Sequence, residues 1–303
     1  MKYLLHVLSV FALVLVLAAC GTAEEDDTAG DGEGDGTEVD VEEAEEGVEE
    51  DDTDATEEEE QELTIGASNV PHAEILEFAS DQLEEEGITL DIRTFNDYIV
   101  PNQALDQEEL DANYFQHIPY LESQIEEHGY DFENAGGIHI EPIGVYSQEY
   151  DSLDDLPEGA EIIMSSSVAD HGRILSMLED EGLITLTEGA GVEATIDDIE
   201  ENPRDLNFRD NVEAAMLPQA FDNNEGDAVL INSNYAIDHG LSPAEDAIAI
   251  ESPDDNPYVN VIAVRSGDED NEAIQTLVEV LRSEEVQDFI LEEYDGSVIP
   301  VNE

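Results

Sequence analysis

The chain has 303 residues, with 81 Asp and Glu against seven Lys and Arg, and a formal net charge of −74. Nucleic-acid binding needs Lys and Arg to neutralise phosphates, so this charge balance excludes it as a function. The single Cys excludes an internal disulfide. Acidic charge at this density is typical of proteins adapted to high salt, where screening is strong. We therefore expect a halophilic protein whose folded part loses structure in low salt.

The first residues predict a lipoprotein signal peptide. Lys2 precedes a mostly apolar run that is too short for a typical membrane span and ends in "LAAC" at Cys20. We predict a signal peptide over 1–19 and a lipid, such as palmitate, on Cys20, which places the protein on the extracytoplasmic face of the cell membrane. A plain secretory signal that contains a Cys is the alternative. Residues 20–62 are small and acidic without aromatic residues, which predicts a disordered tether.

From Leu63 onward, strand-like and helix-like segments alternate. The apolar patterns predict strands over 63–68, 88–95 and 110–116, helices over 71–87, 100–109 and 118–130, and a long strand over 137–147 that is interrupted at Pro142. This alternation predicts an α/β fold with mostly parallel sheets.

The second half continues in the same style. The patterns predict strands over 160–167, 206–211, 227–236, 247–252 and 256–266, and helices from near Asp170 to Gly182, over 271–282 and over 283–296, the last with Ser283 as its N-cap. The chain contains no G-x-S-x-G, P-loop, G-x-G-x-x-G or H-E-x-x-H motif. These observations favour a binding protein over an enzyme, and we expect no cofactor.

Several stretches together resemble a known family. They include "FNDYIVPNQAL", "LDANYFQHIPYLE", "IHIEPIGVYS", "HGRILSMLEDEGLITL", "AVLINSNYA" and "NPYVNVIAVR". The chain resembles the NlpA-type family, the methionine-binding lipoproteins of ABC importers. The resemblance implies a two-lobed, periplasmic-binding-protein-like (type II) fold, two chain crossovers and a ligand cleft between the lobes. We place lobe one at 63–143 and 253–303 and lobe two at 144–252. The implied partners are methionine or a similar amino acid, an ABC permease and its ATPase.

The polar candidates match the family's ligand-binding positions. Arg173 begins a helix in "HGR", and a guanidinium can grip a ligand carboxylate with two parallel hydrogen bonds. Its alternative role is to pair with neighbouring acids. Asn232 ends an apolar strand, where a side-chain amide can bond both the amino and carboxylate groups of a ligand. Asn234 is the second choice within the same motif, and it could instead be a turn residue.

A thioether needs an apolar, aromatic slot, because sulfur packs well beside rings. The resemblance assigns Tyr98, Phe115 and His117 to this slot, and His72 is a secondary candidate near the cleft. Strand alternation predicts that Phe115 and His117 share one face, while Tyr114 and Gln116 share the other. Tyr120 and Tyr130 are expected to be structural.

One departure from the family leaves the ligand open. The family carries an Asn-Asp-Pro-Thr-Asn run before "GR", whereas this chain reads "SSSVADHGR", with Ser166 as a secondary candidate for the replacement contact and Asp170 just before the helix motif. The ligand could therefore be L-methionine, D-methionine, a short peptide or another apolar amino acid. Capture of Zn or Mn is an alternative function, although the histidines are scattered along the sequence and form no close ligand pair, so we predict no metal site. A hydrolase that uses His117 or His171 lacks a nucleophile.

Overall fold

A computed structural model describes residues 61–301 of the chain. The predicted signal peptide, the lipidation site at Cys20 and nearly all of the predicted tether lie outside the described residues. The first strand, β1 (Gln61–Ser68), includes the last two residues of the predicted tether. Its first amide, that of Gln61, donates to the Gly87 carbonyl oxygen. Within residues 61–301, no helix combines the length and the apolar character needed to cross a membrane.

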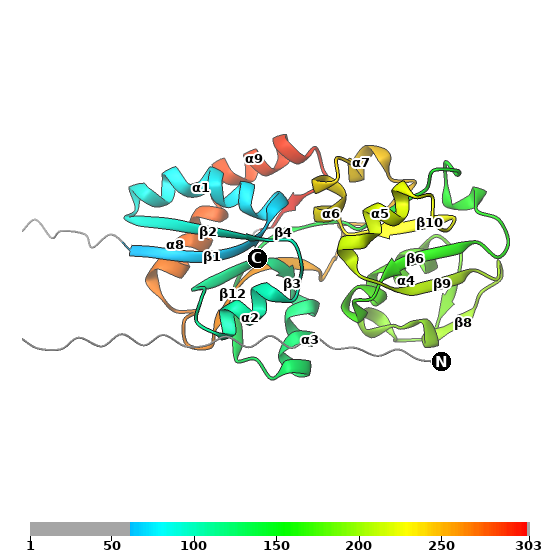
Figure 1. Cartoon of the computed structure of the whole chain (residues 1–303), viewed down its shortest axis with the longest axis horizontal. Coiled ribbons are helices and arrows are strands. Elements are labelled where there is room, and N and C mark those ends of the chain that lie inside the picture. The colour runs from blue at the N-terminus through cyan, green and yellow to red at the C-terminus, as the bar shows by residue number, and fades with distance from the viewer. Residues whose placement is uncertain (1–60, 302–303) are drawn as a thin grey trace, which may run out of the picture. The chain divides into compact units, whose positions relative to one another are not determined.

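The larger sheet has six strands in the order β13-β4-β12-β3-β1-β2. β1 pairs in parallel with β2 (Ile88–Phe95) and with β3 (Ala112–His117). β12 (Val259–Arg265) pairs antiparallel with β3 and with β4 (Phe132–Ile140), and β13 (Ile299–Pro300) pairs antiparallel with β4. Figure 1 shows this sheet in one half of the described chain, with helices on both of its faces.

Helices cover both faces of this sheet because its strands carry apolar side chains on both sides. On β12, Ile262 and Val264 pack into the core under α1, α8 and α9, while Val261 and Ala263 pack against α2 and α3. The helices are α1 (Glu74–Glu85), α2 (Val100–Asp106), α3 (Ile118–His128), α8 (Glu272–Leu281) and α9 (Glu284–Tyr294), with a short helical turn at Asn69–Ala73 before α1.

The second sheet has five strands in the order β11-β5-β10-β6-β9. The strands are β5 (Gly144–Tyr146), β6 (Glu161–Ser165), β9 (Asn207–Val212), β10 (Ala228–Ile231) and β11 (Ala249–Ile250), and a small separate sheet joins β7 (Thr185–Leu186) to β8 (Ile199–Glu201).

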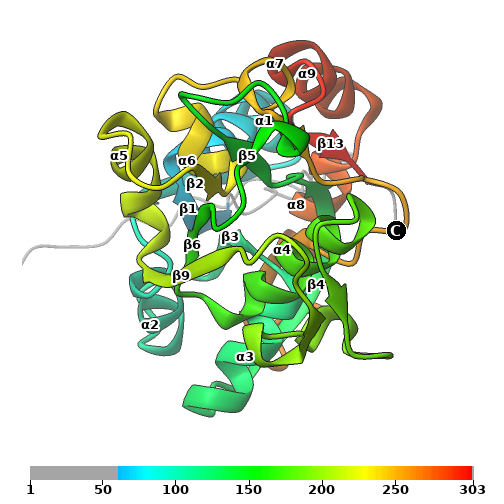
Figure 2. The same ribbon diagram turned by 90° about the vertical axis from the view of Figure 1, so that its right-hand side faces the viewer.

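Side chains of the second sheet also alternate between two cores. Ile162 and Met164 of β6 pack with α4 (Val168–Asp180), whereas Ile163 packs with α5 (Leu217–Asp222) and α6 (Ser233–Asp238) on the other face. Figure 2, in which this half of the described chain is turned towards the viewer, shows α4 and α5 on opposite sides of β6. The remaining elements are α7 (Pro243–Asp246) and short 3-10 turns at Leu153–Asp155, Gly191–Glu193, Ile196–Asp198 and Ala214–Met216.

The chain passes between the two sheets twice, which gives the two-lobed fold. β4 ends at Ile140, and three residues around Pro142 lead directly into β5 of the second sheet. The chain returns through residues 251–258, between β11 and β12. Strands of the larger sheet thus lie within 61–140 and 259–300, and those of the second sheet within 144–250, on the two sides of the proposed lobe boundaries.

Two sequence-based expectations are wrong in detail. The sheets are mixed, not mostly parallel, because the strand that leaves a lobe (β4) and the strand that returns (β12) run in opposite directions. The strand predicted over 227–236 ends at Ile231, and α6 begins at Ser233. The predicted N-cap of the last helix is confirmed, because the Ser283 hydroxyl accepts from the Val286 amide at the start of α9. Gly129 closes α3 in the left-handed conformation with φ 73°.

Candidate functional site

A narrow chamber lies where the two lobes meet. It has a volume of about 30 Å³ and is lined by both lobes and by the first crossover; the lining residues are Tyr98, Phe115, Gln116, His117, Tyr120, Glu141, Asp170, Arg173, Asn232, Ser233, Asn234 and Asn260. This volume is far below that of a typical small-molecule site, so the lobes must move apart before a ligand fits between them. The chamber therefore brings together Tyr98, Phe115, His117, Arg173 and Asn232, the five principal residues predicted from the sequence, together with Asn234.

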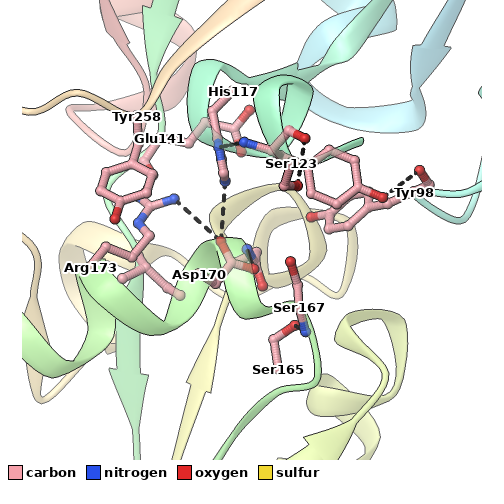
Figure 3. A network of polar contacts seen from close by, with 12 residues as sticks. Tyr98, His117, Ser123, Glu141, Ser165, Ser167, Asp170, Arg173 and Tyr258 are labelled. Carbon is pink, nitrogen blue, oxygen red and sulfur yellow. Dashed lines mark hydrogen bonds and ion pairs between the residues drawn. The ribbon is translucent and has the colours of Figure 1, made fainter. Parts of the chain in front are cut away.

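His117 reaches across the chamber from the end of β3. Its Nδ1 accepts from the Tyr120 amide at 3.1 Å and so caps α3, which leaves the proton on Nε2. That nitrogen donates to Asp170 Oδ1 at 3.2 Å, as Figure 3 shows. The bond from the Tyr120 amide thus fixes the tautomer of His117. As a result, the Nε2–H group of His117 in lobe one donates to the Asp170 carboxylate in lobe two.

Asp170 occupies the centre of the site, in the first turn of α4. Its side chain is 2% exposed, and besides His117 it accepts from Asn232 Nδ2 at 3.2 Å, while Arg173 Nη1 lies 3.9 Å away. Burial opposes ionisation of this carboxyl, but the hydrogen bond from His117, together with Arg173 and Asn232, outweighs it and lowers the pKa of Asp170 below its usual value. Asp170 is thus a buried carboxylate, and the sequence indicated it only as a departure from the family motif.

Arg173 lines the chamber, but most of its donors are already occupied. Nε donates to Glu251 at 3.0 and 3.2 Å, and Nη2 donates to the same carboxylate and to the Glu141 carbonyl oxygen at 2.7 Å. Burial disfavours the charged guanidinium, yet Glu251 more than compensates and raises the pKa of Arg173. Only Nη1 is left to meet a ligand. The Cζ atom also lies 4.5 Å from the centre of the Tyr258 ring.

Close packing explains the glycine that precedes this arginine. A Cβ atom on Gly172 would lie 2.2 Å from the Val192 carbonyl oxygen, so a side chain there would push α4 away from the turn at Gly191–Glu193. Because α4 carries Asp170 and Arg173, this close approach also sets the position of both side chains.

Asn232 follows β10 at the start of α6. Its Nδ2 donates to Asp170, whereas its Oδ1 is buried and has no hydrogen-bond partner among the described residues. An unpaired buried acceptor is unfavourable, and such groups are rare in folded proteins. Asn232 therefore presents an acceptor to the chamber.

Aromatic rings form the other side of the chamber. The centre of the Tyr98 ring lies 6.1 Å from that of Phe115 and 5.9 Å from that of Tyr120. The Tyr98 hydroxyl, whose pKa burial raises well above its usual value, donates to Asn234 Oδ1 of the opposite lobe at 2.6 Å.

The two tyrosines that were expected to be structural differ in position. Tyr120 lines the chamber, so its assignment as a purely structural residue is wrong; its amide donates to His117 and its hydroxyl donates to the Tyr98 carbonyl oxygen at 2.9 Å. Tyr130 stacks on Phe132 in the core at a ring separation of 4.8 Å, as expected.

The predicted division of β3 holds only in part. Tyr114 packs in the core behind the chamber, and its hydroxyl donates to His139 Nδ1. Gln116 was expected on the same face, but it lines the chamber together with Phe115 and His117. A register irregularity in the partner strand, between Val261 and Ile262, accompanies this change in the alternation.

A second cluster of histidines lies behind the chamber. The Nε2 atoms of His72 and His139 both approach Glu141 Oε1, at 3.2 and 2.8 Å, and Asn260 Oδ1 accepts from His72 at 3.0 Å. The prediction that no histidines pair closely is therefore wrong: residues far apart in sequence meet here because the turn at Asn69–Ala73, the end of β4 and the start of β12 lie together.

This cluster has the residue types of a metal site, since ligand atoms of His72, His139 and Glu141 all lie within 4.8 Å of one another. Burial lowers the pKa of His72 to about 4 and of His139 to about 3, so both rings are neutral. Hydrogen bonds account for the arrangement without a metal. A metal on His72 Nε2 would move its proton to Nδ1, which has no partner among the described residues. His72 is buried behind the chamber lining.

A larger vestibule lies next to the chamber. It has a volume of about 710 Å³ and shares Tyr98 and Tyr120 with the chamber. Ser166, the secondary candidate for a replacement contact, lines the vestibule and is exposed, so the structure does not bring it to the inner chamber.

Comparison with known proteins gives the family. Residues 63–302 match the NlpA lipoprotein family. The methionine-binding lipoprotein MetQ of Bacillus subtilis is 50% identical over 244 residues, which cover 80% of this chain and 89% of that protein. The D-methionine-binding lipoprotein MetQ of Yersinia pestis is 36% identical over 216 residues, covering 71% and 79%.

A solved structure agrees with these relatives. A nutrient-binding protein from Burkholderia cenocepacia, bound to methionine, superposes with a TM-score of 0.75 at 40% identity, covering 79% of this chain and 100% of that one. The match to the family covers well over half of the sequence, and it includes both lobes and all the strands that line the chamber. This chain belongs to the NlpA lipoprotein family.

Proposed function

We propose that the protein is a non-catalytic solute receptor of an ABC importer that binds methionine or a closely related amino acid. The observation that carries this proposal is the chamber itself, which places an aromatic wall opposite a guanidinium, an amide and a carboxylate. These are the groups that a thioether side chain and an amino-acid backbone require. The names of the relatives and the methionine-bound neighbour support the same ligand.

Each part of methionine has a counterpart in the chamber. The thioether would lie beside Phe115, Tyr98 and Tyr120, where sulfur–ring contacts are favourable. The carboxylate would meet Arg173 Nη1, the guanidinium nitrogen that makes no hydrogen bond to Glu251. Asn232, with its unpaired acceptor, would hold the amino group.

Ligand binding and lobe closure would be one process. The bonds from His117 to Asp170 and from Tyr98 to Asn234 already cross from one lobe to the other, and all four residues line the chamber. A ligand can enter only if the lobes part, and it then adds its own contacts to both sides. In our proposal a lipid on Cys20 keeps the receptor at the membrane, where the closed form delivers its ligand to the permease and the ATPase.

Calorimetry in high salt tests the proposal. L-methionine, D-methionine, alanine, leucine and a methionine-containing dipeptide would be titrated into the folded domain, with Zn²⁺ and Mn²⁺ as further titrants. Saturable one-to-one binding of a methionine, with the amino acid recovered unchanged, supports a receptor. Binding of the metal ions alone, or chemical conversion of the ligand, would replace the proposal with metal capture or catalysis.

A further inference from the structure

The unpaired groups of the chamber are mainly acceptors. Asn232 Oδ1 is buried without a partner among the described residues, and its orientation is set by Nδ2, which donates to Asp170; turning the amide over would place two oxygens against each other. Asp170 accepts two hydrogen bonds, both 3.2 Å long, whereas a carboxylate has about four acceptor positions. Two neighbouring side chains thus offer free lone pairs to the same space.

The positive charge of the chamber is largely neutralised before a ligand arrives. Among the described residues that line it, Arg173 is the one with a permanent positive charge, and Glu251 holds its Nε and Nη2. The remaining nitrogen, Nη1, lies 3.9 Å from Asp170 Oδ1, beyond hydrogen-bond range. A ligand carboxylate placed on Nη1 would therefore also lie close to the Asp170 carboxylate, and like charges repel.

An ammonium group on the adjacent carbon removes this conflict. It would supply donors to Asp170 and to Asn232 Oδ1, and its charge would lie between the two carboxylates. We infer that Asp170 is a specificity-determining residue, and that it makes a cationic amino group the obligatory feature of the ligand, with the carboxylate secondary. This inference rests on the proposed function, since it concerns the same chamber, and it narrows the ligand class to primary amines with an apolar side chain.

Two methionine analogues separate the contribution of the ammonium group to affinity from that of the carboxylate. Methioninol keeps the ammonium and loses the carboxylate, whereas 2-hydroxy-4-(methylthio)butanoate keeps the carboxylate and carries a hydroxyl where methionine carries its ammonium. Calorimetry on the wild-type domain in high salt should show that the hydroxy acid binds at least 100-fold more weakly than methionine. Methioninol should bind about tenfold more weakly than methionine. A hydroxy acid that binds as well as or better than methioninol overturns the inference and leaves methionine binding in place.

Asp170→Asn, which keeps the size and removes the charge, tests the residue itself. Because the oxygen of the new amide would still accept from His117, we expect methionine affinity to fall about tenfold while the gap between methionine and the hydroxy acid shrinks at least tenfold. A residue that only holds the lobes together would weaken all three ligands by the same factor, so an unchanged ratio overturns the role of Asp170. Glu84→Gln, on an exposed position of α1, is the matched control and should change no affinity.

The remaining outcomes are also decisive. Binding of methioninol without methionine would remove the proposed ligand and retain the ammonium requirement. If neither analogue nor methionine binds the wild-type domain, while circular dichroism shows it folded, both the proposed function and this inference are wrong.

Discussion

The molecule contains two buried histidine–carboxylate groups that differ in what they leave free. Glu141 accepts from His139 at 2.8 Å and from the Asn234 amide at 3.0 Å, so each of its oxygens has a donor, and His72 Nε2 lies 3.2 Å from Oε1. Asp170 has longer bonds, both 3.2 Å, and lies beside an acceptor with no partner among the described residues. Both carboxylates line the chamber, but Glu141 joins strands and lobes through oxygens that already have donors, whereas in our proposal Asp170 contacts the ligand.

The pKa values of Glu141 and Asp170 are shifted in opposite directions. Burial raises the pKa of Glu141, and His72 and Arg173 only partly oppose this effect. At Asp170 the neighbouring donors outweigh burial and lower the pKa. A carboxylate held ionised by donors that a ligand can replace is suited to binding a cation, whereas one enclosed by neutral imidazoles is suited to holding structure.

The largest expected effect is on the Glu141 group. Glu141→Ala would leave the His139 imidazole N–H and the Asn234 amide without their acceptor, so we expect the free energy of unfolding to fall by about 3–5 kcal/mol. Urea unfolding in high salt, followed by circular dichroism, measures the change. Glu84→Ala is the control, with no loss of this kind expected. A loss below about 1 kcal/mol would mean that water replaces these bonds and that the group is not structural.

Arg173→Ala tests the polar side of the chamber. The variant removes the donor for a ligand carboxylate and leaves Glu251 buried without its partner, so methionine affinity should fall at least tenfold; truncation of one partner of a buried charge pair costs roughly 2–5 kcal/mol. Calorimetry on folded protein gives the affinity. Arg93→Ala, which breaks an exposed pair with Asp91, should bind as the wild type does. Wild-type affinity in the Arg173 variant would remove this residue from the site.

Phe115→Ala tests the apolar side. Loss of a buried aromatic contact with the ligand side chain is worth about 1.5–3 kcal/mol, so methionine affinity should fall roughly tenfold to a hundredfold. The affinity of the same variant for free alanine, which has no thioether, should fall much less. Parallel titrations with both amino acids give the comparison, and equal losses would argue against a thioether slot beside Phe115.

The smallest expected effect is the change in the free energy of unfolding with pH. His139 has its pKa lowered from 6.5 to about 3, so the unfolded chain takes up a proton near neutral pH that the folded chain does not. The contribution of neutral His139 to the free energy of unfolding is therefore fully present above about pH 6.5. It is lost as the pH falls towards 3, at up to about 1.4 kcal/mol per pH unit. Glu141, with its raised pKa, acts in the opposite direction.

The measurement is the free energy of unfolding between about pH 6.5 and 5 at constant high salt, for the wild type and for His139→Gln. The wild type should lose stability more steeply, by up to one proton per molecule. His128, exposed at the end of α3, provides the control variant His128→Gln, which should follow the wild-type slope. Parallel slopes for all three proteins would show that His139 does not titrate as described.

Much of the chamber could be predicted because its residues lie at positions with a local signature. Phe115 and His117 end an apolar strand, Asn232 follows another, and Arg173 stands in a recognisable helix motif. The partners of these residues could not be predicted. Glu251, which holds Arg173, is 78 residues away in sequence, and one acid among 81 carries no mark of that role. Tyr120 was misjudged because a helical position does not reveal which way its ring turns.

The sequence by itself determined the alternation of strands and helices and the N-cap at Ser283, because these depend on patterns within short segments. The two lobes and the family followed from the resemblance of several longer stretches to the NlpA-type family. Only the tertiary structure decided which acids meet which bases. The chain crosses between the lobes twice, and those crossings bring β3, β4, α4 and residues 251–258 to one place. Pairing in a buried site depends on distances of a few ångströms between segments remote in sequence, and no local pattern carries that information.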